Sequence, residues 1–152
     1  MTTIKITKMQ GCGNDFVVLD YSEYEKSGLS MSELAKKLCD RHFGIGSDGL
    51  ILIAPSKTAD CRMIMYNADG SRGAMCGNGI RCVAKYLFDE GYTNNEKEFT
   101  IESMGAIKHI KVNVIDGKAV SARVDMGKPI LKASDIPVNF DGEKCVNQKV
   151  TF

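Results

Sequence analysis

The sequence predicts an α+β fold in one domain, and three observations indicate this class. Most apolar runs are short and rich in β-branched or aromatic residues, which is typical of strands. Only two segments repeat apolar residues with the 3.6-residue period of a helix. The segments do not alternate in the strand–helix–strand rhythm of a doubly wound sheet. The length of 152 residues suits a single domain with a substantial core.

The N-terminal part is expected to contain two strands and a helix. Residues 3–9 and 15–21 have strand composition, and the segment between them, "QGCGND", is rich in turn formers. Ser30 and Glu33 have the spacing of a capping box. Apolar residues then recur at helical spacing, which predicts a helix over about 31–41.

The central part is expected to contain two buried strands and a second helix. The strands are "GLILIA" at 49–54 and "CRMIMYN" at 61–67, and the second runs into the turn "NADGS". The helix is predicted from residues at i, i+3, i+4, i+7 and i+8, which are Ile80, Val83, Ala84, Leu87 and Phe88. Gly91 is expected to end it.

The C-terminal part is expected to consist of strands and irregular chain. Three segments have strand composition: 98–103, 106–115 and 118–126. Asp116-Gly117 joins the last two as a hairpin turn. Pro129 and Pro137 mark irregular chain, and residues 145–152 are expected to form one more strand.

The bulk composition excludes several kinds of partner. The formal net charge is +1, so no charged surface for nucleic acid or an anionic membrane is indicated. No apolar run approaches the roughly 18 residues that a membrane-spanning helix needs. The N-terminus, "MTTIKITKMQ", lacks the apolar core of a signal peptide. A cytoplasmic protein without nucleic-acid or membrane partners is expected.

The six cysteines are not spaced as metal ligands. None forms C-x-x-C, and neither of the two histidines lies at ligand spacing from a cysteine, so no metal site is predicted. In a reducing compartment they are expected to be free thiols. Four of them are expected to be small core residues: Cys39, Cys61, Cys82 and Cys145.

The segment Gly44–Gly49 matches the glycine pattern of a dinucleotide-binding loop, G-x-G-x-x-G. That loop follows a strand and opens a helix, whereas here the predicted helix precedes and the predicted strand follows. The segment is therefore expected to be a helix-to-strand turn.

Cys76 is the strongest candidate for chemistry. Asn78-Gly79 is also typical of a hairpin, but the helical period after it favours Gly77, Asn78 and Gly79 as the start of a helix. The first N–H groups of a helix lack partners and carry the positive end of its dipole. They bind anions and stabilise a thiolate over a thiol. Cys76 is thus a candidate base or nucleophile, the alternative being an inert thiol at a helix start.

Two polar turns are candidates for small-molecule recognition. One offers Asn14 and Asp15 between the first two strands, and the other offers Asn67 and Asp69. The alternative is ordinary turn chemistry, because Asn and Asp hydrogen-bond their own backbone in turns.

Four segments together carry a family resemblance: "KMQGCGNDFVVLD", "RHFGIGSDGLILI", "NADGS" and "MCGNGIRCVAKYL". In order and spacing the chain resembles the diaminopimelate epimerase family from residue 4 to about 130. Gln10 stands where the family usually has His. The resemblance implies two similar domains, each a strongly curved mixed β-sheet around a central α-helix, with the substrate between them. Residues 1–152 are then the first, N-terminal domain, and the second domain lies outside this chain.

The resemblance also implies an activity and roles for residues. The family interconverts LL- and meso-2,6-diaminopimelate without a cofactor, on the bacterial route to lysine and peptidoglycan. One cysteine takes the α-proton as thiolate, and a second-domain cysteine returns a proton to the opposite face as thiol. Cys76 matches the first of these. The backbone N–H groups of Gly77 and Asn78 match the carboxylate contacts, Asn14 a contact near the reacting amine, and Asn67 a contact to the distal end.

Two other functions are weighed against this one. The chain could be a non-catalytic, ligand-binding domain of epimerase-like fold, or a related amino-acid racemase or isomerase on the same scaffold. A second cysteine–glycine helix start downstream would argue against the first, and substrate turnover would decide the second. The sequence leaves open whether the protein forms a homodimer.

Overall fold

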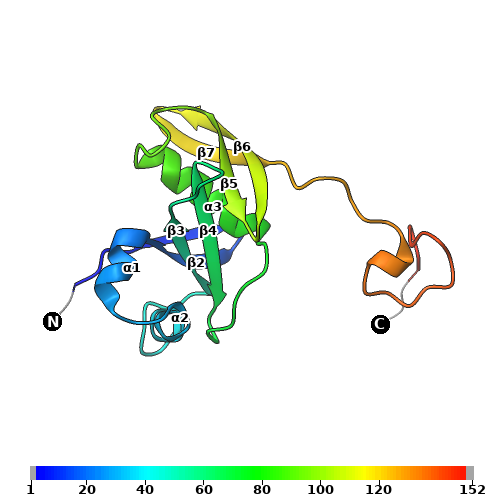
Figure 1. The fold of residues 1–152 in the computed structure, drawn as a ribbon, viewed down its shortest axis with the longest axis horizontal. Helices are drawn as coiled ribbons and strands as arrows, with labels where there is room; N and C mark the ends of the chain where they lie inside the picture. Colours follow the sequence, from blue (N-terminus) through cyan, green and yellow to red (C-terminus); the bar gives the residue numbers. More distant parts are fainter. Residues whose placement is uncertain (1–2, 150–152) are drawn as a thin grey trace.

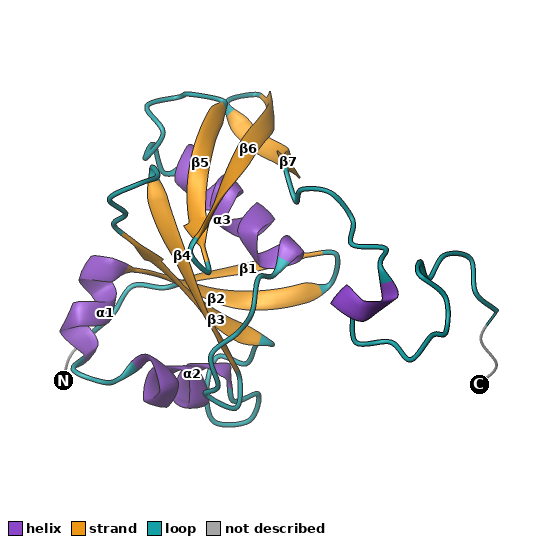
Figure 2. Cartoon of the chain, turned by 45° about the vertical axis from the view of Figure 1, so that its right-hand side comes forward, coloured by secondary structure: helices purple, strands orange, loops and turns teal. Residues whose placement is uncertain are grey.

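A seven-stranded mixed sheet curves around one helix in the computed structural model, which describes residues 3–149 (Figures 1 and 2). The strands are β1 (Thr7–Gly11), β2 (Asn14–Asp20), β3 (Gly49–Ala54), β4 (Cys61–Asn67), β5 (Glu98–Ser103), β6 (Ala106–Ile115) and β7 (Lys118–Val124). The helices are α1 (Tyr21–Ser27), α2 (Met31–Cys39) and α3 (Gly77–Asp89), followed by a short 3-10 helix, η1 (Ala133–Asp135). The predicted α+β class and the curved sheet around a central helix are confirmed.

The strand directions explain why the helices lie on opposite faces of the sheet. The order across the sheet is the order along the chain, and only β2/β3 and β4/β5 are parallel pairs. Each parallel pair needs a crossover, through α1 and α2 in the first and through α3 in the second. β3 and β4 are antiparallel, so the second crossover starts from a reversed strand. A right-handed crossover must then use the other face, and α3 lies opposite α2.

Side chains of the central strands point alternately to the two faces of the sheet, and a hydrophobic core forms on each face. In β2, Phe16 and Val18 pack with α3, whereas Val17 and Leu19 pack with α2. In β3, Ile51 faces α3 in the same way. Successive residues of a strand point to opposite faces, so a strand covered on both sides is apolar throughout. Both central strands therefore lack the polar alternation of a half-exposed strand.

Most predicted elements are confirmed, with corrections at two places in the N-terminal part. The first strand begins at Thr7, and Tyr21 is the first residue of α1 instead of the last of a strand. Helix α1 was not predicted. The Asp20 side chain accepts a hydrogen bond from the Ser22 N–H and so starts α1, and Gly28, in the left-handed region at φ 64°, ends it.

The chain after β7 leaves the sheet as an extended segment (Figure 1). The predicted strand at 145–152 is wrong for 145–149, where no strand forms, and residues 150–152 lie outside the described part. Cys145 is only half-buried, so its assignment to the core is also wrong. The reason is that this segment lies outside the sheet, where its apolar residues have few partners: Ile130, Leu131, Val138 and Val146 are exposed.

Gly44 lies where no side chain fits. The loop after α2 folds back so that the Gly44 N–H donates to the Asp40 carbonyl. A Cβ on Gly44 would lie 2.2 Å from the Lys37 carbonyl oxygen and 2.9 Å from that of Leu38. We expect Gly44→Ala to lower the free energy of unfolding by about 2 kcal/mol or more, because backbone atoms must move. Urea titration followed by circular dichroism measures this.

Phe43→Ala is the matched control. Phe43 is the neighbouring residue, and it is 95% exposed. Its truncation is expected to change the free energy of unfolding by under about 0.5 kcal/mol, as for most surface sites. Equal stability of Gly44→Ala and the wild type would show that the loop accommodates a side chain.

Candidate active site at the start of helix α3

Cys76 is the N-cap residue of α3, as the sequence predicts. Its backbone is extended, and its carbonyl oxygen accepts a hydrogen bond from the Ile80 N–H at 3.0 Å. Its Sγ accepts another from the Gly79 N–H at 3.3 Å. The sulfur therefore sits over the first turn, beside the backbone N–H groups of Gly77 and Asn78, which have no acceptor within the helix. The Gly79 N–H and the positive end of the helix dipole therefore both lie beside the sulfur.

Asn14 lies against this sulfur, although it is 62 residues away in the chain. The Cys76 thiol donates to Asn14 Oδ1 with an S–O distance of 3.7 Å. Asn14 is the first residue of β2, directly after the two-residue turn at Cys12 and Gly13, both of which have positive φ.

Gly11 lets the β1–β2 hairpin approach α3. A Cβ on Gly11 would lie 3.2 Å from the Asn78 carbonyl oxygen and 3.5 Å from Cys82 Sγ. Larger side chains would hold the hairpin away from the helix. Gly11, the last residue of β1, thus contributes to the contact between Asn14 and Cys76.

Asn67 lies at the same end of the sheet. It is the last residue of β4 and pairs with Gly49 of β3, which in turn pairs with Phe16 of β2. The Asn67 side-chain nitrogen donates to Ser71 Oγ at 2.9 Å within its own turn. The structure thus brings Asn14, Cys76, Gly77 and Asn78 together and places Asn67 at the same end, with turn contacts of its own.

A charged cluster that the sequence did not predict contacts the side-chain nitrogen of Asn14. The Asp48 carboxylate accepts from Asn14 Nδ2 at 2.6 Å and from Arg41 Nη2 at 2.8 Å. Arg41 also pairs with Asp15 at 2.8 Å, and Lys8 pairs with Asp15 at the same distance. Hydrogen bonds from Arg41 and then Lys8 hold the pKa of Asp15 well below its usual range.

The register of β2 and β3 could have suggested this cluster. Asp48 immediately precedes β3, and the parallel pairing places it beside the start of β2. The segment Gly44–Gly49 is predicted to be a helix-to-strand turn, which is confirmed: it joins α2 to β3, and the Gly46 N–H donates to the Leu38 carbonyl oxygen. The turn is also what carries Asp48 to Asn14.

Burial distinguishes Cys76 from three other thiols. Cys39, Cys61 and Cys82 are buried, as predicted, whereas Cys76 is half-buried. Burial raises the pKa of Cys61 to about 12 and that of Cys82 to about 11, and it also raises that of Cys39. Removal from water disfavours a thiolate, so these three thiols are poor nucleophiles at neutral pH.

We expect Cys76 to react with iodoacetamide ahead of these buried thiols near pH 7, because only the thiolate reacts. Peptide mapping by mass spectrometry at several times measures the order. Cys12 is exposed at the hairpin turn, so the comparison is made in a Cys12→Ser background. Faster labelling of Cys39 or Cys61 in the folded protein would show that the helix start does not activate Cys76.

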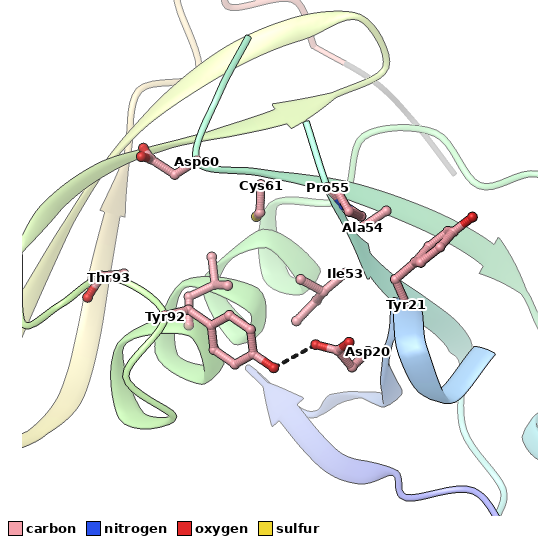
Figure 3. A pocket seen from close by; sticks show the side chains of 10 residues that line it. Asp20, Tyr21, Ile53, Ala54, Pro55, Asp60, Cys61, Tyr92 and Thr93 are labelled. Carbon is pink, nitrogen blue, oxygen red and sulfur yellow. Dashed lines mark hydrogen bonds between the residues drawn. The ribbon is translucent and has the colours of Figure 1, made fainter. Parts of the chain in front are cut away.

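A cavity of about 200 Å³ lies at the other end of the sheet (Figure 3). It is lined by Asp20, Ile53, Cys61 and Leu87 among others, and the Tyr92 hydroxyl donates to Asp20 at 2.7 Å on its wall. None of the predicted site residues lines it.

Within residues 3–149, no group of three or more His, Cys, Asp or Glu side chains could hold a metal ion. No helix in the same range is long and apolar enough to cross a membrane.

Comparison with known proteins gives one family. The family model described as Diaminopimelate epimerase matches residues 6–132. The diaminopimelate epimerase of Acetivibrio thermocellus is 52% identical over 140 residues, which cover 92% of this chain and 49% of that protein. That of Alkaliphilus metalliredigens is 44% identical over 147 residues, covering 97% of this chain and 51% of that protein. The chain spans about half the length of the curated relatives it matches.

Solved structures of other proteins share the fold. A methylitaconate-delta-isomerase matches with a TM-score of 0.64 and 19% identity, over 76% of this chain and 36% of that chain. A probable proline racemase from Agrobacterium radiobacter matches with a TM-score of 0.64 and 20% identity, over 80% of this chain and 41% of that chain. At these identities the similarity concerns the fold alone. The family model, which matches residues 6–132, and the two relatives, which align with more than nine-tenths of the chain, show that the chain belongs to the diaminopimelate epimerase family.

Proposed function

We propose that this chain is the N-terminal half of a cofactor-independent epimerase that interconverts LL- and meso-2,6-diaminopimelate, a precursor of lysine and peptidoglycan. The observation that carries the proposal is the position of Cys76 at the start of α3, with Asn14 against its sulfur. Family membership supports the substrate. The half-length match to the relatives supports a second domain as the partner that completes the site.

In this proposal Cys76 exchanges the α-proton with one face of the substrate. As thiolate, its sulfur takes the proton and becomes a thiol, and the electron pair of the broken C–H bond stays on the α-carbon. A second thiol from the other domain then gives its proton to the opposite face of that carbon and becomes a thiolate. Each face of the α-carbon requires its own acid–base group, so Cys76 serves one face only.

The start of α3 stabilises the charge that this step creates. The electron pair left on the α-carbon is shared with the substrate carboxylate. The backbone N–H groups of Gly77 and Asn78 lack acceptors within the helix and are the proposed donors to that carboxylate. Donors that are already oriented do not have to rearrange as the charge develops, which makes such sites effective.

Asn14 and Asn67 are the proposed recognition residues. Asn14 is proposed to contact the reacting amino group, which its position beside the sulfur supports. Asn67 is proposed to contact the distal end of the substrate, which its position at the same end of the sheet supports. The enzyme is proposed to work in the cytoplasm, where reducing conditions keep Cys76 out of disulfide bonds; the six cysteines are free in the structure.

The function is tested by turnover in deuterated water. The full-length protein is incubated with LL-diaminopimelate, and meso product and α-deuterium are followed by NMR and mass spectrometry. Appearance of meso product with one α-deuterium supports the proposal. Conversion of L-proline instead would indicate a related racemase, and binding of diaminopimelate without exchange would indicate a ligand-binding protein.

Asn67→Ala in the full-length protein is expected to raise KM for diaminopimelate about tenfold or more, with a smaller change in kcat. The contact is made to the part of the substrate that does not react, so it stabilises the bound substrate and the transition state equally. Steady-state kinetics in both directions measures this. Ser71→Ala removes the turn partner of Asn67 and keeps its amide, so it separates recognition from turn stability. An unchanged kcat/KM for Asn67→Ala would leave Asn67 as a turn residue only.

A further inference from the structure

The orientation of the Asn14 side-chain amide is fixed by its neighbour. The Asp48 carboxylate accepts three hydrogen bonds: from Asn14 Nδ2 at 2.6 Å, from the Asp15 N–H at 3.1 Å and from Arg41 Nη2 at 2.8 Å. An ionised carboxylate has no hydrogen to donate. Only the NH₂ group of Asn14 can therefore face Asp48, and Oδ1 is left facing Cys76, where it accepts from the thiol.

This orientation gives the two sides of the site opposite character. Asn14 Oδ1 is an acceptor, so it suits the hydrogens of an ammonium group. The first N–H groups of α3 are donors with a positive dipole, so they suit a carboxylate. An α-amino acid carries both groups on one carbon. If the amide turned by 180°, its NH₂ group would face the substrate ammonium, and the distinction would be lost.

We propose that Asp48, held by Arg41, is a positioning residue that keeps the Asn14 carbonyl oxygen directed at Cys76, so that the site receives an amino acid with its ammonium group on the Asn14 side. This inference rests on the proposed function. Asp48 does not touch Cys76 in the structure and acts through Asn14. Arg41 holds Asp48 directly, because its Nη2 donates to Asp48 Oδ1 at 2.8 Å, and the same guanidinium also pairs with Asp15.

The structural half of the proposal is tested in the 152-residue chain by NMR of the Asn14 side-chain NH₂ group. In the wild type, its hydrogens are expected to exchange with water slowly, because one is bonded to Asp48. Asp48→Asn keeps the size of the side chain but removes the charge and allows either end of residue 48 to face Asn14. We expect exchange to become at least about fivefold faster. Unchanged exchange in Asp48→Asn would overturn the proposal.

Asp15→Asn is the matched control for this measurement. It removes one of the two carboxylates on Arg41, as Asp48→Asn does, but Asp15 makes no side-chain hydrogen bond to Asn14. The Asn14 NH₂ exchange rate is expected to stay within about twofold of the wild type. An equal acceleration in both variants would mean that net charge, not the Asp48 contact, sets the rate, and would also overturn the proposal.

The functional half is tested by steady-state kinetics of the full-length protein. Asp48→Asn is expected to raise KM for LL-diaminopimelate about tenfold and to lower kcat less than about threefold, because a misoriented amide weakens binding of the ammonium group. A purely structural role would lower kcat through loss of folded protein and leave KM unchanged, and that result overturns the proposal. A wild-type protein that does not epimerise diaminopimelate, with the NMR result intact, contradicts the proposed function but not the role of Asp48 in orienting Asn14.

Discussion

Cys76→Ser in the full-length protein is expected to lower kcat/KM for diaminopimelate by about 10²-fold to 10⁴-fold, the usual contribution of a positioned acid or base. Serine has nearly the size of cysteine, and its hydroxyl is an equally good N-cap, so α3 is retained. A hydroxyl, however, does not ionise near neutral pH. The variant thus removes the base and leaves the donors of Gly77 and Asn78 in place.

The measurement is the rate of meso product formation, with folding checked by circular dichroism. Cys12→Ser is the control, because Cys12 is exposed in the hairpin turn and makes no hydrogen bond to Cys76. It is expected to keep kcat/KM within about threefold of the wild type. Activity of Cys76→Ser comparable to that of Cys12→Ser would exclude Cys76 as the base.

The second large effect is expected for the 152-residue chain by itself, which should not interconvert LL- and meso-diaminopimelate detectably. Inversion requires a proton to leave one face of the carbon and another to arrive at the opposite face. Among the described residues, only Cys76 is a cysteine that caps the start of a helix; Cys12 lies in a turn, and Cys82 is inside α3. Each preorganised donor that is missing typically costs a factor of about 10² or more.

The test compares this chain with the full-length protein in deuterated water at equal concentration. Meso product and α-deuterium are followed over several hours. A rate of meso product formation near that of the full-length protein, abolished by Cys76→Ser, would contradict the two-domain proposal. It would require a second base within this chain or from another copy of it.

The part of the candidate site that the sequence predicts is the part encoded locally. The apolar period from Ile80 onward places a helix, and the glycines before it place Cys76 at its start. The contacts of Asn14 depend instead on the pairing of β2 with β3 and on the packing of the β1–β2 hairpin against α3. Such contacts join residues that are tens of positions apart, so Asp48 and Arg41 carry no local signal of their role.

The missed helix has a similar explanation. Helix α1 contains seven residues and buries none of them, so it has no apolar period to detect. Its signals are the cap at Asp20 and the glycine at position 28, both at its ends. Conversely, the apolar residues after β7 have strand composition but no sheet to join in the described residues. Composition alone predicted a strand over 145–149, where pairing does not occur.

The order of the strands across the sheet has a consequence for how the chain folds. Every strand pairs with its neighbour along the chain, so no pairing has to wait for a strand that is distant in sequence. Contacts of short separation close small loops, which costs little entropy and favours rapid folding. The antiparallel pairs β1–β2 and β3–β4 and the antiparallel unit β5–β6–β7 can form first, and the two parallel pairings then join them around α3. The sheet that surrounds α3 and the proposed catalytic Cys76 can therefore assemble strand by strand in the order in which the ribosome synthesises the chain.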